Sequence, residues 1–264
     1  MSDLGTLYRH RQLIAALTSR DLKARYRGSI LGYFWSLANP LLLLAVYTFV
    51  FTVIMNPRLD VQPYPLFLFA GILPWAFFSA AVLESTNAIS SNAGLIKKVM
   101  FPAEALPLVV VLSHLVHLVL AIPVFLAALV TYTLLGKAAV TANLLLVPFV
   151  MLLQTFFVVG IAMIVASASV LFRDLRDIIT NLMHLGFFIT PIIYPIEEIG
   201  SRPWRAVLRL NPMTPFVVSY QNLLFYGRLP NLSDTLLMIG YAAASTMLGF
   251  FVFNRLRDAL AEAI

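Results

Sequence analysis

Long apolar runs alternate with short polar segments from residue 30 almost to the C-terminus. An α-helix needs about 20 residues to cross the hydrocarbon core of a bilayer. Six runs have about this length, at residues 30–55, 66–88, 106–135, 144–172, 178–196 and 235–253. The pattern predicts an all-α integral membrane protein with six transmembrane helices, so both termini are expected on the same side of the membrane.

The first 28 residues precede these runs and are polar and basic. Apolar residues recur among them at roughly helical spacing, at Leu4, Leu7, Ile14 and Leu17. Six basic residues share the segment: Arg9, Arg11, Arg20, Lys23, Arg25 and Arg27. This combination predicts an amphipathic interfacial helix on an anionic leaflet. The apolar run that follows is too long for a signal peptide and has no small-residue cleavage site, so we expect it to stay as an anchor.

The distribution of charge predicts the orientation, because cytoplasmic segments of membrane proteins are enriched in Lys and Arg. Of the 18 Lys and Arg residues, twelve fall on the side of the predicted bundle that carries the termini and six on the other. Both termini are therefore expected in the cytoplasm. We expect a single transmembrane domain over residues 1–264, with a cytoplasmic arm at 1–28, six spans within 29–254 and a cytoplasmic tail at 255–264.

The segment at 197–234 is too long for a simple turn between the fifth and sixth runs. Its best apolar stretch, 216–226, has 11 residues and is too short to span a membrane. Pro203, Pro212 and Pro215 divide the segment into short pieces. We predict short re-entrant or interfacial helices on the outer face, suited to a lid, with polar backbone groups satisfied by protein or water. An ordinary surface loop with a buried apolar patch is the alternative.

The composition excludes several kinds of chemistry. Hydrophobic residues make up 61% of the chain and charged residues 11%, whereas soluble domains carry about 25% charged residues. The chain has no cysteine, which excludes disulfides, thiolate metal ligands and a cysteine nucleophile. Glu84 is the one acidic residue inside a predicted span, so a proton relay is not expected. Its carboxylate either reaches the cytoplasmic interface or contacts a subunit interface or pathway.

Candidate catalytic and metal sites are few. A phosphate-binding loop needs a Gly-rich turn with Lys and Ser or Thr at fixed spacing. The Gly136-Lys137 pair is followed by Ala138 on the predicted outer face, so we do not expect this chain to hydrolyse ATP. His114 and His117 can share a helix face, but no carboxylate or third histidine is near them in the sequence. Contacts between packed helices are therefore favoured over a metal site.

Several local motifs resemble one family of membrane proteins. The first motif, at 20–35, reads RDLKARYRGSILGYFW and is followed by Asn39-Pro40. Matching stretches follow in the same order at 95–102 (LIKKVMFP), 172–175 (FRDL), 191–195 (PIIYP) and 210–212 (LNP). Together they resemble the permease subunits of type-2 ABC exporters, which move O-antigen, capsule or teichoic acid chains. The resemblance covers essentially the whole chain.

The resemblance implies a channel formed by two copies of the chain, docked on two separate ABC ATPase subunits. ATP and Mg²⁺ would bind to those partners, and this chain would bind no cofactor, no metal and no nucleic acid. The substrate would be lipid-linked polysaccharide, which would cross the lipid bilayer of a bacterial inner membrane. The first motif would border the cytoplasmic opening and the subunit interface. Its residues at these places would be Arg25, Tyr26, Arg27, Ser29 and Trp35.

In this family, the loop between the second and third spans forms a coupling helix that inserts into the ATPase. Here that loop carries Lys97, Lys98, Phe101 and Pro102. A plain basic cytoplasmic loop would explain the lysines but not the apolar residues beside them, so coupling is favoured. Arg173 and Asp174 lie at the other short cytoplasmic turn, where a second ATPase contact and a local salt bridge are alternatives of equal weight.

A long glycan needs a continuous channel, and aromatic rings can stack on sugar faces while most hydroxyl groups stay hydrated. The candidate channel-lining aromatics in the first and fifth spans are Tyr47, Phe51, Phe187, Phe188 and Tyr194. The choice of these two spans follows from the family. Aromatic residues that form interfacial belts or face lipid are the alternative. His184, alone among apolar residues of the fifth span, is interpreted as a packing or pore-lining group.

Other functions remain as alternatives. The same scaffold serves permeases for drugs or lipids, although the motif at 25–32 argues against them. A membrane enzyme of glycan assembly would need acidic residues on its loops. The outer face offers only scattered ones, namely Asp60, Glu197, Glu198 and Asp234. A structural membrane scaffold would have no need of a coupling loop.

Overall fold

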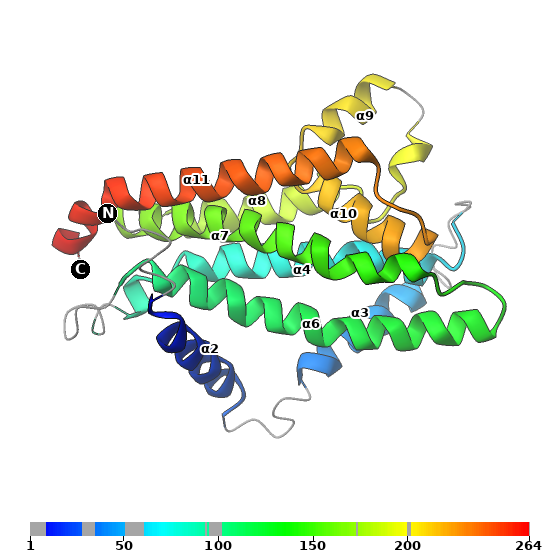
Figure 1. Cartoon of the computed structure of the whole chain (residues 1–264), viewed down its shortest axis with the longest axis horizontal. Helices are drawn as coiled ribbons and strands as arrows, with labels where there is room; N and C mark the ends of the chain where they lie inside the picture. Colours follow the sequence, from blue (N-terminus) through cyan, green and yellow to red (C-terminus); the bar gives the residue numbers. More distant parts are fainter. Residues whose placement is uncertain are drawn as a thin grey trace.

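The computed structural model describes residues 9–27, 35–50, 61–92, 94, 102–172, 174–199 and 202–263. Helices form most of these ranges, and no strand occurs within them. Four segments in this part of the chain are long and apolar enough to cross a membrane: Tyr64–Ser85, Ala105–Leu134, Ala142–Leu171 and Leu232–Arg257. They run side by side as a bundle (Figure 1). The prediction of an all-α protein with membrane-spanning helices is confirmed to this extent.

The four segments match apolar runs of the sequence. They contain α4 (Tyr64–Ser85), α6 (Ala105–Leu134), η4 (Ala142–Leu146) with α7 (Val147–Leu171), and α11 (Leu232–Ala263). Proline lies in the first turn of α4 and of α7. At that position its fixed φ suits the helix, and its missing N–H would have had no partner within the helix. Proline and hydrophobicity together therefore account for where α4 and α7 begin.

The first and fifth predicted spans contain shorter helices, α3 (Trp35–Phe49) and α8 (Leu175–Ile189), of 15 residues each. Fifteen residues rise about 22 Å, which is less than the roughly 30 Å of the hydrocarbon core. α8 ends just before Pro191, because a residue that precedes proline is disfavoured in helical geometry. The first run continues into residues 51–60, which lie outside the described residues. The count of six spans stays a prediction.

α4 occupies the centre of the bundle, in contact with α3, α6, α7, α8 and the short helix α10 (Thr214–Gln221). Most of its side chains are buried. The rings of Phe78, Phe157 and Phe216 link α4, α7 and α10, with centroids 5.7 Å and 5.3 Å apart. Each such pair contributes about 0.5–1.5 kcal/mol beyond its buried area. This core fixes α4, and with it the residues that α4 presents to its neighbours.

α7 and α11 approach each other closely along a seam of small residues. A Cβ on Gly160 would lie 2.1 Å from the carbonyl group of Ser245, and a Cβ on Gly249 would lie 2.5 Å from the Gly160 oxygen. Across the seam, Thr246 Oγ1 donates a hydrogen bond of 2.9 Å to the carbonyl of Phe156. Small residues at a tight crossing are typical of membrane helices, which associate by packing and interhelical hydrogen bonds.

Short helices connect α8 to α11. They are η5 (Ile196–Glu198), α9 (Arg202–Arg209), α10 and the π-helical turn η6 (Asn222–Tyr226). All eight residues of α10 are buried. α9 stands off from the bundle (Figure 1), and its Trp204 and Val207 are exposed. The segment is therefore largely helical and partly buried. Its placement relative to a membrane stays a prediction.

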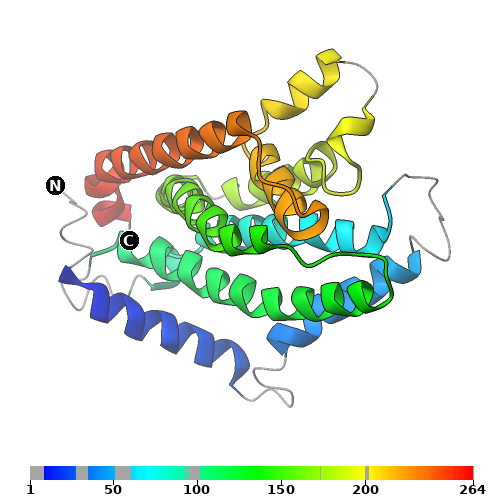
Figure 2. The same ribbon diagram turned by 45° about the vertical axis from the view of Figure 1, so that its right-hand side comes forward.

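α2 (Arg11–Tyr26) forms where the sequence predicts an N-terminal helix, and it packs on α6. Figure 2 shows it beside the N-terminal half of α6. Ile14 is 5% exposed and Leu17 is partly buried at this contact, so protein covers part of the face that we expected to meet lipid. Leu4 and Leu7 lie outside the described residues, and the position of α2 on a membrane surface stays a prediction.

Candidate functional site: an ionic network and an aromatic groove

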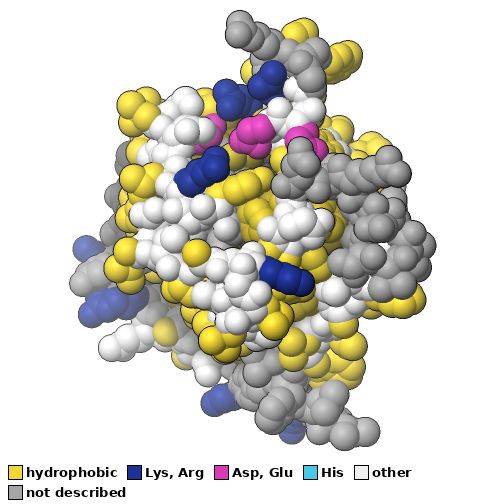
Figure 3. Space-filling model, turned by 90° about the vertical axis from the view of Figure 1, so that its right-hand side faces the viewer, with side chains coloured by type: hydrophobic (Ala, Val, Ile, Leu, Met, Phe, Trp, Pro, Cys, Tyr) yellow, Lys and Arg dark blue, Asp and Glu magenta, His cyan; other side chains and the backbone are white. Residues whose placement is uncertain are grey.

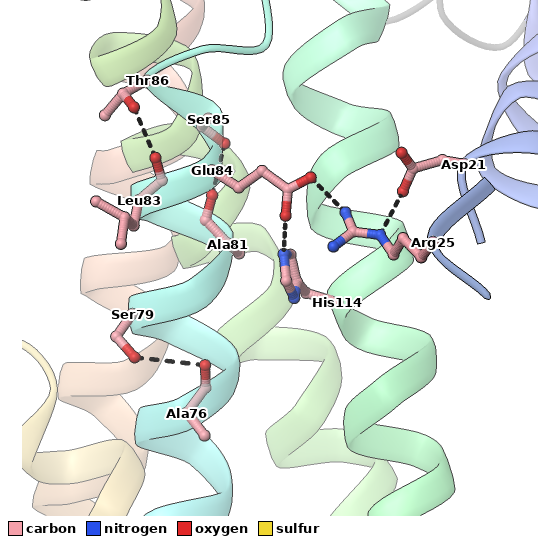
Figure 4. A network of polar contacts seen from close by, with 10 residues as sticks. All are labelled: Asp21, Arg25, Ala76, Ser79, Ala81, Leu83, Glu84, Ser85, Thr86 and His114. Atoms are coloured by element: carbon pink, nitrogen blue, oxygen red, sulfur yellow. Dashed lines mark hydrogen bonds and ion pairs between the residues drawn. The ribbon is translucent and has the colours of Figure 1, made fainter. Parts of the chain in front are cut away.

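An ionic network ties three helices together near the end of the bundle where α11 ends (Figure 4). Arg25 of α2 lies between two carboxylates. Its Nε donates to Asp21 Oδ2 at 2.9 Å, and its Nη2 donates to Oε1 of Glu84 on α4. The other oxygen of Glu84 lies 2.7 Å from Nε2 of His114 on α6. Glu84 therefore bridges α2 and α6 from the last turn of α4.

Partial burial explains why these groups pair. The side chains of Arg25, Glu84 and His114 are 25%, 37% and 11% exposed. A charge at the centre of a membrane helix costs about 2.5–3.5 kcal/mol on insertion scales, and charges within spans therefore tend to have partners. Both oxygens of Glu84 have one. The sequence left two roles open for this carboxylate, and the structure adds a third, a contact among helices of the same chain.

His114 and His117 lie on the same side of α6, as their spacing predicts. Their ring centroids are 5.7 Å apart, with the ring planes at 65°. His114 makes a polar contact between helices through Glu84, which is the role that the sequence favours. Within the described ranges, no three His, Cys, Asp or Glu side chains are grouped as a metal site. His114 therefore belongs to the contact between α4 and α6, and His117 packs on its ring.

A polar cavity of about 240 Å³ lies beside the network, among α2, the end of α4, the turn η3 (Ser90–Asn92) and the start of α6. Its polar lining residues are Arg20, Asp21, Glu84, Asn87, Ser91 and Asn92. Charges of both signs stand here with amide and hydroxyl groups. The cavity is therefore suited to a small polar group that both donates and accepts hydrogen bonds.

An aromatic groove of about 570 Å³ lies between α4 and α8. Trp75 and Phe187 are neighbours in its wall, with ring centroids 6.3 Å apart, and Phe188 stands at 90° to Phe187 at 5.4 Å. The polar lining residues are Ser79, Thr180 and His184. Phe188 is 65% exposed, so the groove is open along this side. It can hold part of a long molecule without enclosing it.

Gly186 allows the wall of the groove to form. A Cβ at this position would lie 2.7 Å from Cη2 of Trp75, so only a glycine lets the indole pack directly on α8. Sugar rings present apolar C–H faces with hydroxyl groups around their edges. Aromatic faces flanked by a few hydroxyl and imidazole groups suit such a ligand, because apolar contact supplies area and polar groups set orientation. The geometry can therefore accommodate sugar units.

Two of the predicted channel-lining aromatics, Phe187 and Phe188, lie in the aromatic groove. Tyr194 follows α8, and its hydroxyl donates to the carbonyl of Phe188 at 3.0 Å. Tyr47 lies on α3, but its side chain is not among those described, and Phe51 lies outside the described residues. The structure brings the fifth-span residues together and adds a tryptophan from α4. A wall shared with the first span stays a prediction.

Four of the five residues predicted at the cytoplasmic opening are described, and they lie at the end of α2 and the start of α3. Arg25 belongs to the ionic network, and Tyr26 is the last residue of α2. Arg27 follows α2 and is exposed, while Trp35 begins α3 and is 38% exposed. Ser29 lies outside the described residues. Arg25 has a partner outside its own helix, namely Glu84 of α4.

Most of the predicted coupling residues lie outside the described residues, namely Lys97, Lys98, Phe101 and Arg173. Pro102 is buried shortly before α6 begins. Asp174 is exposed and precedes α8, where its carbonyl accepts from the amide N–H groups of Asp177 and Ile178. The ATPase contacts of both turns stay predictions.

Sequence reasoning missed the partners of Glu84 and the role of Trp75. A lone carboxylate in a span signals that a partner exists, and the basic arm offers several candidates. Local spacing does not select Arg25 from among them, because the two residues are 59 positions apart. Trp75 lies in an unbroken apolar run and has no local signal at all.

Comparison with known proteins identifies the family. The model described as "ABC-2 type transporter" matches residues 12–225. The O-antigen export system permease protein RfbA of Myxococcus xanthus is 38% identical over 259 residues, which cover 98% of this chain and 97% of the relative. A protein of the same name from Klebsiella pneumoniae is 33% identical over 264 residues, with coverages of 99% and 97%.

A more distant relative is the polysialic acid transport protein KpsM of Escherichia coli. It is 24% identical over 205 residues, which cover 77% of this chain and 78% of the relative. The family model spans most of the chain, including the ionic network and the aromatic groove. The two permeases named for O-antigen export align over nearly its full length. On these grounds, the chain belongs to the ABC-2 type transporter family.

Proposed function

We propose that this chain is the membrane-spanning permease subunit of an ABC transporter that exports lipid-linked polysaccharide of the O-antigen type. The observation that carries the proposal is the nearly full-length similarity, at 31% to 38% identity, to permeases named for O-antigen export. A relative named for polysialic acid transport supports a sugar polymer as the class of substrate. A permease for a drug or lipid is the alternative within the same family.

The energy for export would come from another subunit. The sequence contains no phosphate-binding loop, and ABC-2 permeases work with ABC ATPases. ATP and Mg²⁺ would bind to two ATPase subunits, while two copies of this chain would form the channel. This chain would need no cofactor of its own. Purified alone it should not hydrolyse ATP, and activity should appear with the co-expressed ATPase.

The end of the bundle where α11 ends would face the cytoplasm. Basic residues of α2, Arg176 at the start of α8, and Arg255 and Arg257 near the end of α11 all favour this orientation. The opposite end carries scattered basic and acidic side chains among uncharged ones (Figure 3). Localisation would be the bacterial inner membrane. α3 and α8 would serve as the first and fifth of six spans.

α8 supports a place beside the translocation path. Its exposed apolar residues include Ile178, Leu182, Leu185, Phe188 and Ile189. A contiguous exposed apolar face marks a surface that meets lipid or another subunit. The aromatic groove opens beside this face and would let sugar units stack on Phe187 and Phe188, with the buried indole of Trp75 packed against Phe187. Repeated weak stacking contacts would allow a polymer to slide without being held at one position.

The cytoplasmic contacts complete the proposed mechanism. Lys97, Lys98, Phe101 and Pro102 would dock on the ATPase, with Arg173 and Asp174 as a second contact. Closure of the ATPases would thereby move α4 and α6, the helices on either side of the loop that carries Lys97 and Lys98. Arg25 and Glu84 would hold α2 to the same helices at the cytoplasmic opening.

A complementation experiment tests the proposal. A strain that makes lipid-linked O-antigen but lacks its own permease receives this chain together with its ABC ATPase partner. We expect glycan at the cell surface. Phe187→Ala with Phe188→Ala should lower export, whereas Phe251→Ala, an exposed ring on α11, should not. No surface glycan, despite membrane insertion and ATPase pairing, would overturn the choice of substrate and favour the drug or lipid alternative.

A further inference from the structure

A long apolar groove of about 600 Å³ lies between α6 and α7, and no charged or aromatic residue lines it. Thirteen residues line it, and twelve of them are apolar. Those used in the argument are Leu115, Val119, Leu126, Val147, Met151 and Leu152. The one polar residue, Thr155, donates its hydroxyl to the carbonyl of Met151 at 2.7 Å. The groove therefore offers no free side-chain hydrogen-bonding group to a ligand.

The shape of the groove matches part of a lipid. It follows α6 from Leu112 to Leu126, about 21 Å at 1.5 Å per residue, which is about two-thirds of the roughly 30 Å hydrocarbon core. Both walls are membrane-spanning helices, so its long axis lies along the bilayer normal. Leu144 and Val147, at the start of the α7 segment, place one end of the groove in the half away from the α11 terminus.

We propose that this groove binds one acyl chain of a phospholipid of the bilayer leaflet on that side. A sugar is excluded by the apolar lining. A single acyl chain is apolar and narrow and runs along the bilayer normal, so it fits both the lining and the direction of the groove. A helix of a second copy of the chain is the competing occupant, and chain-to-chain cross-links would reveal it.

Basic residues on the two connections that follow α6 and η6 favour a lipid with an anionic head group. The loop that joins α6 to η4 carries Lys137 and no acidic residue. Lys137 is exposed three residues beyond the end of α6. Arg228 is also exposed and follows η6, whose Leu224 lines the groove. Basic residues beside an acyl-chain groove can pair with the phosphate of the bound lipid.

Photolabelling tests the proposal on the full chain in vesicles of phosphatidylglycerol and phosphatidylcholine. The probe is phosphatidylglycerol with a photoreactive group in the middle of one acyl chain, and labelled peptides are mapped by mass spectrometry. Leu248 on α11 is 55% exposed and serves as the reference for ordinary lipid contact, against Leu152 at 54%. We expect about fivefold more label at Leu152, equivalent to about 1 kcal/mol for one basic residue near the head group.

Two substitutions fill the groove from opposite walls. Val119→Trp and Leu152→Trp change exposed residues at its edge, so the larger ring can enter the groove without displacing buried side chains. Each should reduce label at Met151 to the level at Leu248, whereas Leu248→Trp should not change it. Lys137→Glu should remove the preference for phosphatidylglycerol over a phosphatidylcholine probe. Equal label at Leu152 and Leu248, or chain-to-chain cross-links in place of lipid adducts, would overturn the proposal.

Discussion

Replacing Glu84 by Gln is expected to loosen α2 from the bundle. The substitution preserves the shape of the side chain and removes the charge that joins Arg25 to His114. A buried hydrogen bond to a charged group contributes about 1.5–3 kcal/mol, and an exposed ion pair about 0.2–1 kcal/mol. Glu84 is 37% exposed and Arg25 is 25% exposed, so the contribution should lie between these limits, at about 1.4 kcal/mol.

Cysteine labelling measures this loosening directly, because the chain has no cysteine of its own. Ile14→Cys introduces a thiol on α2 at its contact with α6, where the native side chain is 5% exposed. A loss of about 1.4 kcal/mol raises the open population about tenfold, so maleimide labelling should become about ten times faster in Glu84→Gln. Arg25→Met should have a similar effect, and the double substitution should add little.

Asp21→Asn is the matched control. It removes the other carboxylate partner of Arg25, but this pair lies within α2 at i,i+4 and does not hold the helix to the bundle. Such pairs contribute about 0.3–0.5 kcal/mol, so labelling should rise about twofold at most. An unchanged labelling rate in Glu84→Gln, or an equal effect of Asp21→Asn, would refute the assignment of Glu84 as the residue that holds α2.

Three further predictions concern packing, topology and coupling. Gly160→Ala places a Cβ 2.1 Å from the α11 backbone and should destabilise the protein by at least 1–3 kcal/mol, whereas Gly240→Ala meets open space and should leave the Tm in detergent unchanged or raise it. A cysteine at Lys137 should label from outside intact spheroplasts and one at Lys98 should not; the reverse pattern would invert the orientation. Phe101→Ala should weaken ATPase docking by one to two decades, because burying a Phe ring contributes about 1.5–3 kcal/mol. Copurification at wild-type stoichiometry with export at the wild-type rate would contradict that coupling role.

Hydrophobicity located the long helices well because each must satisfy its backbone within a continuous apolar segment. The run at 106–135 corresponds to α6, Ala105–Leu134, and the run at 144–172 to α7 with its preceding turn. The run at 178–196 overestimated α8, which ends at Ile189. Pro191 lies inside that run and indicates that the helix ends before it, but hydropathy alone does not detect the effect of proline on the backbone.

The candidate site was less accessible from the sequence because its contacts join distant segments. Phe187 and Phe188 were predicted as channel aromatics, yet their neighbour Trp75 lies more than a hundred residues away. Gly186 is the local sign of that contact, but a glycine in a helix does not reveal which side chain packs against it. The structure shows that this side chain is the indole of Trp75. A carboxylate within a span indicates that a partner is present. The sequence does not identify Arg25 and His114 as the partners of Glu84, because tertiary packing brings these distant residues together.

The central claim is that this chain carries polysaccharide across a membrane with energy from a separate ATPase. The most direct measurement is export in inverted vesicles that contain the purified chain and its ATPase, with lipid-linked O-antigen supplied at the ATPase side. Glycan protected inside the vesicles should accumulate only when both subunits and ATP with Mg²⁺ are present. Rapid ATP hydrolysis by the assembled complex without any protected glycan would contradict the account.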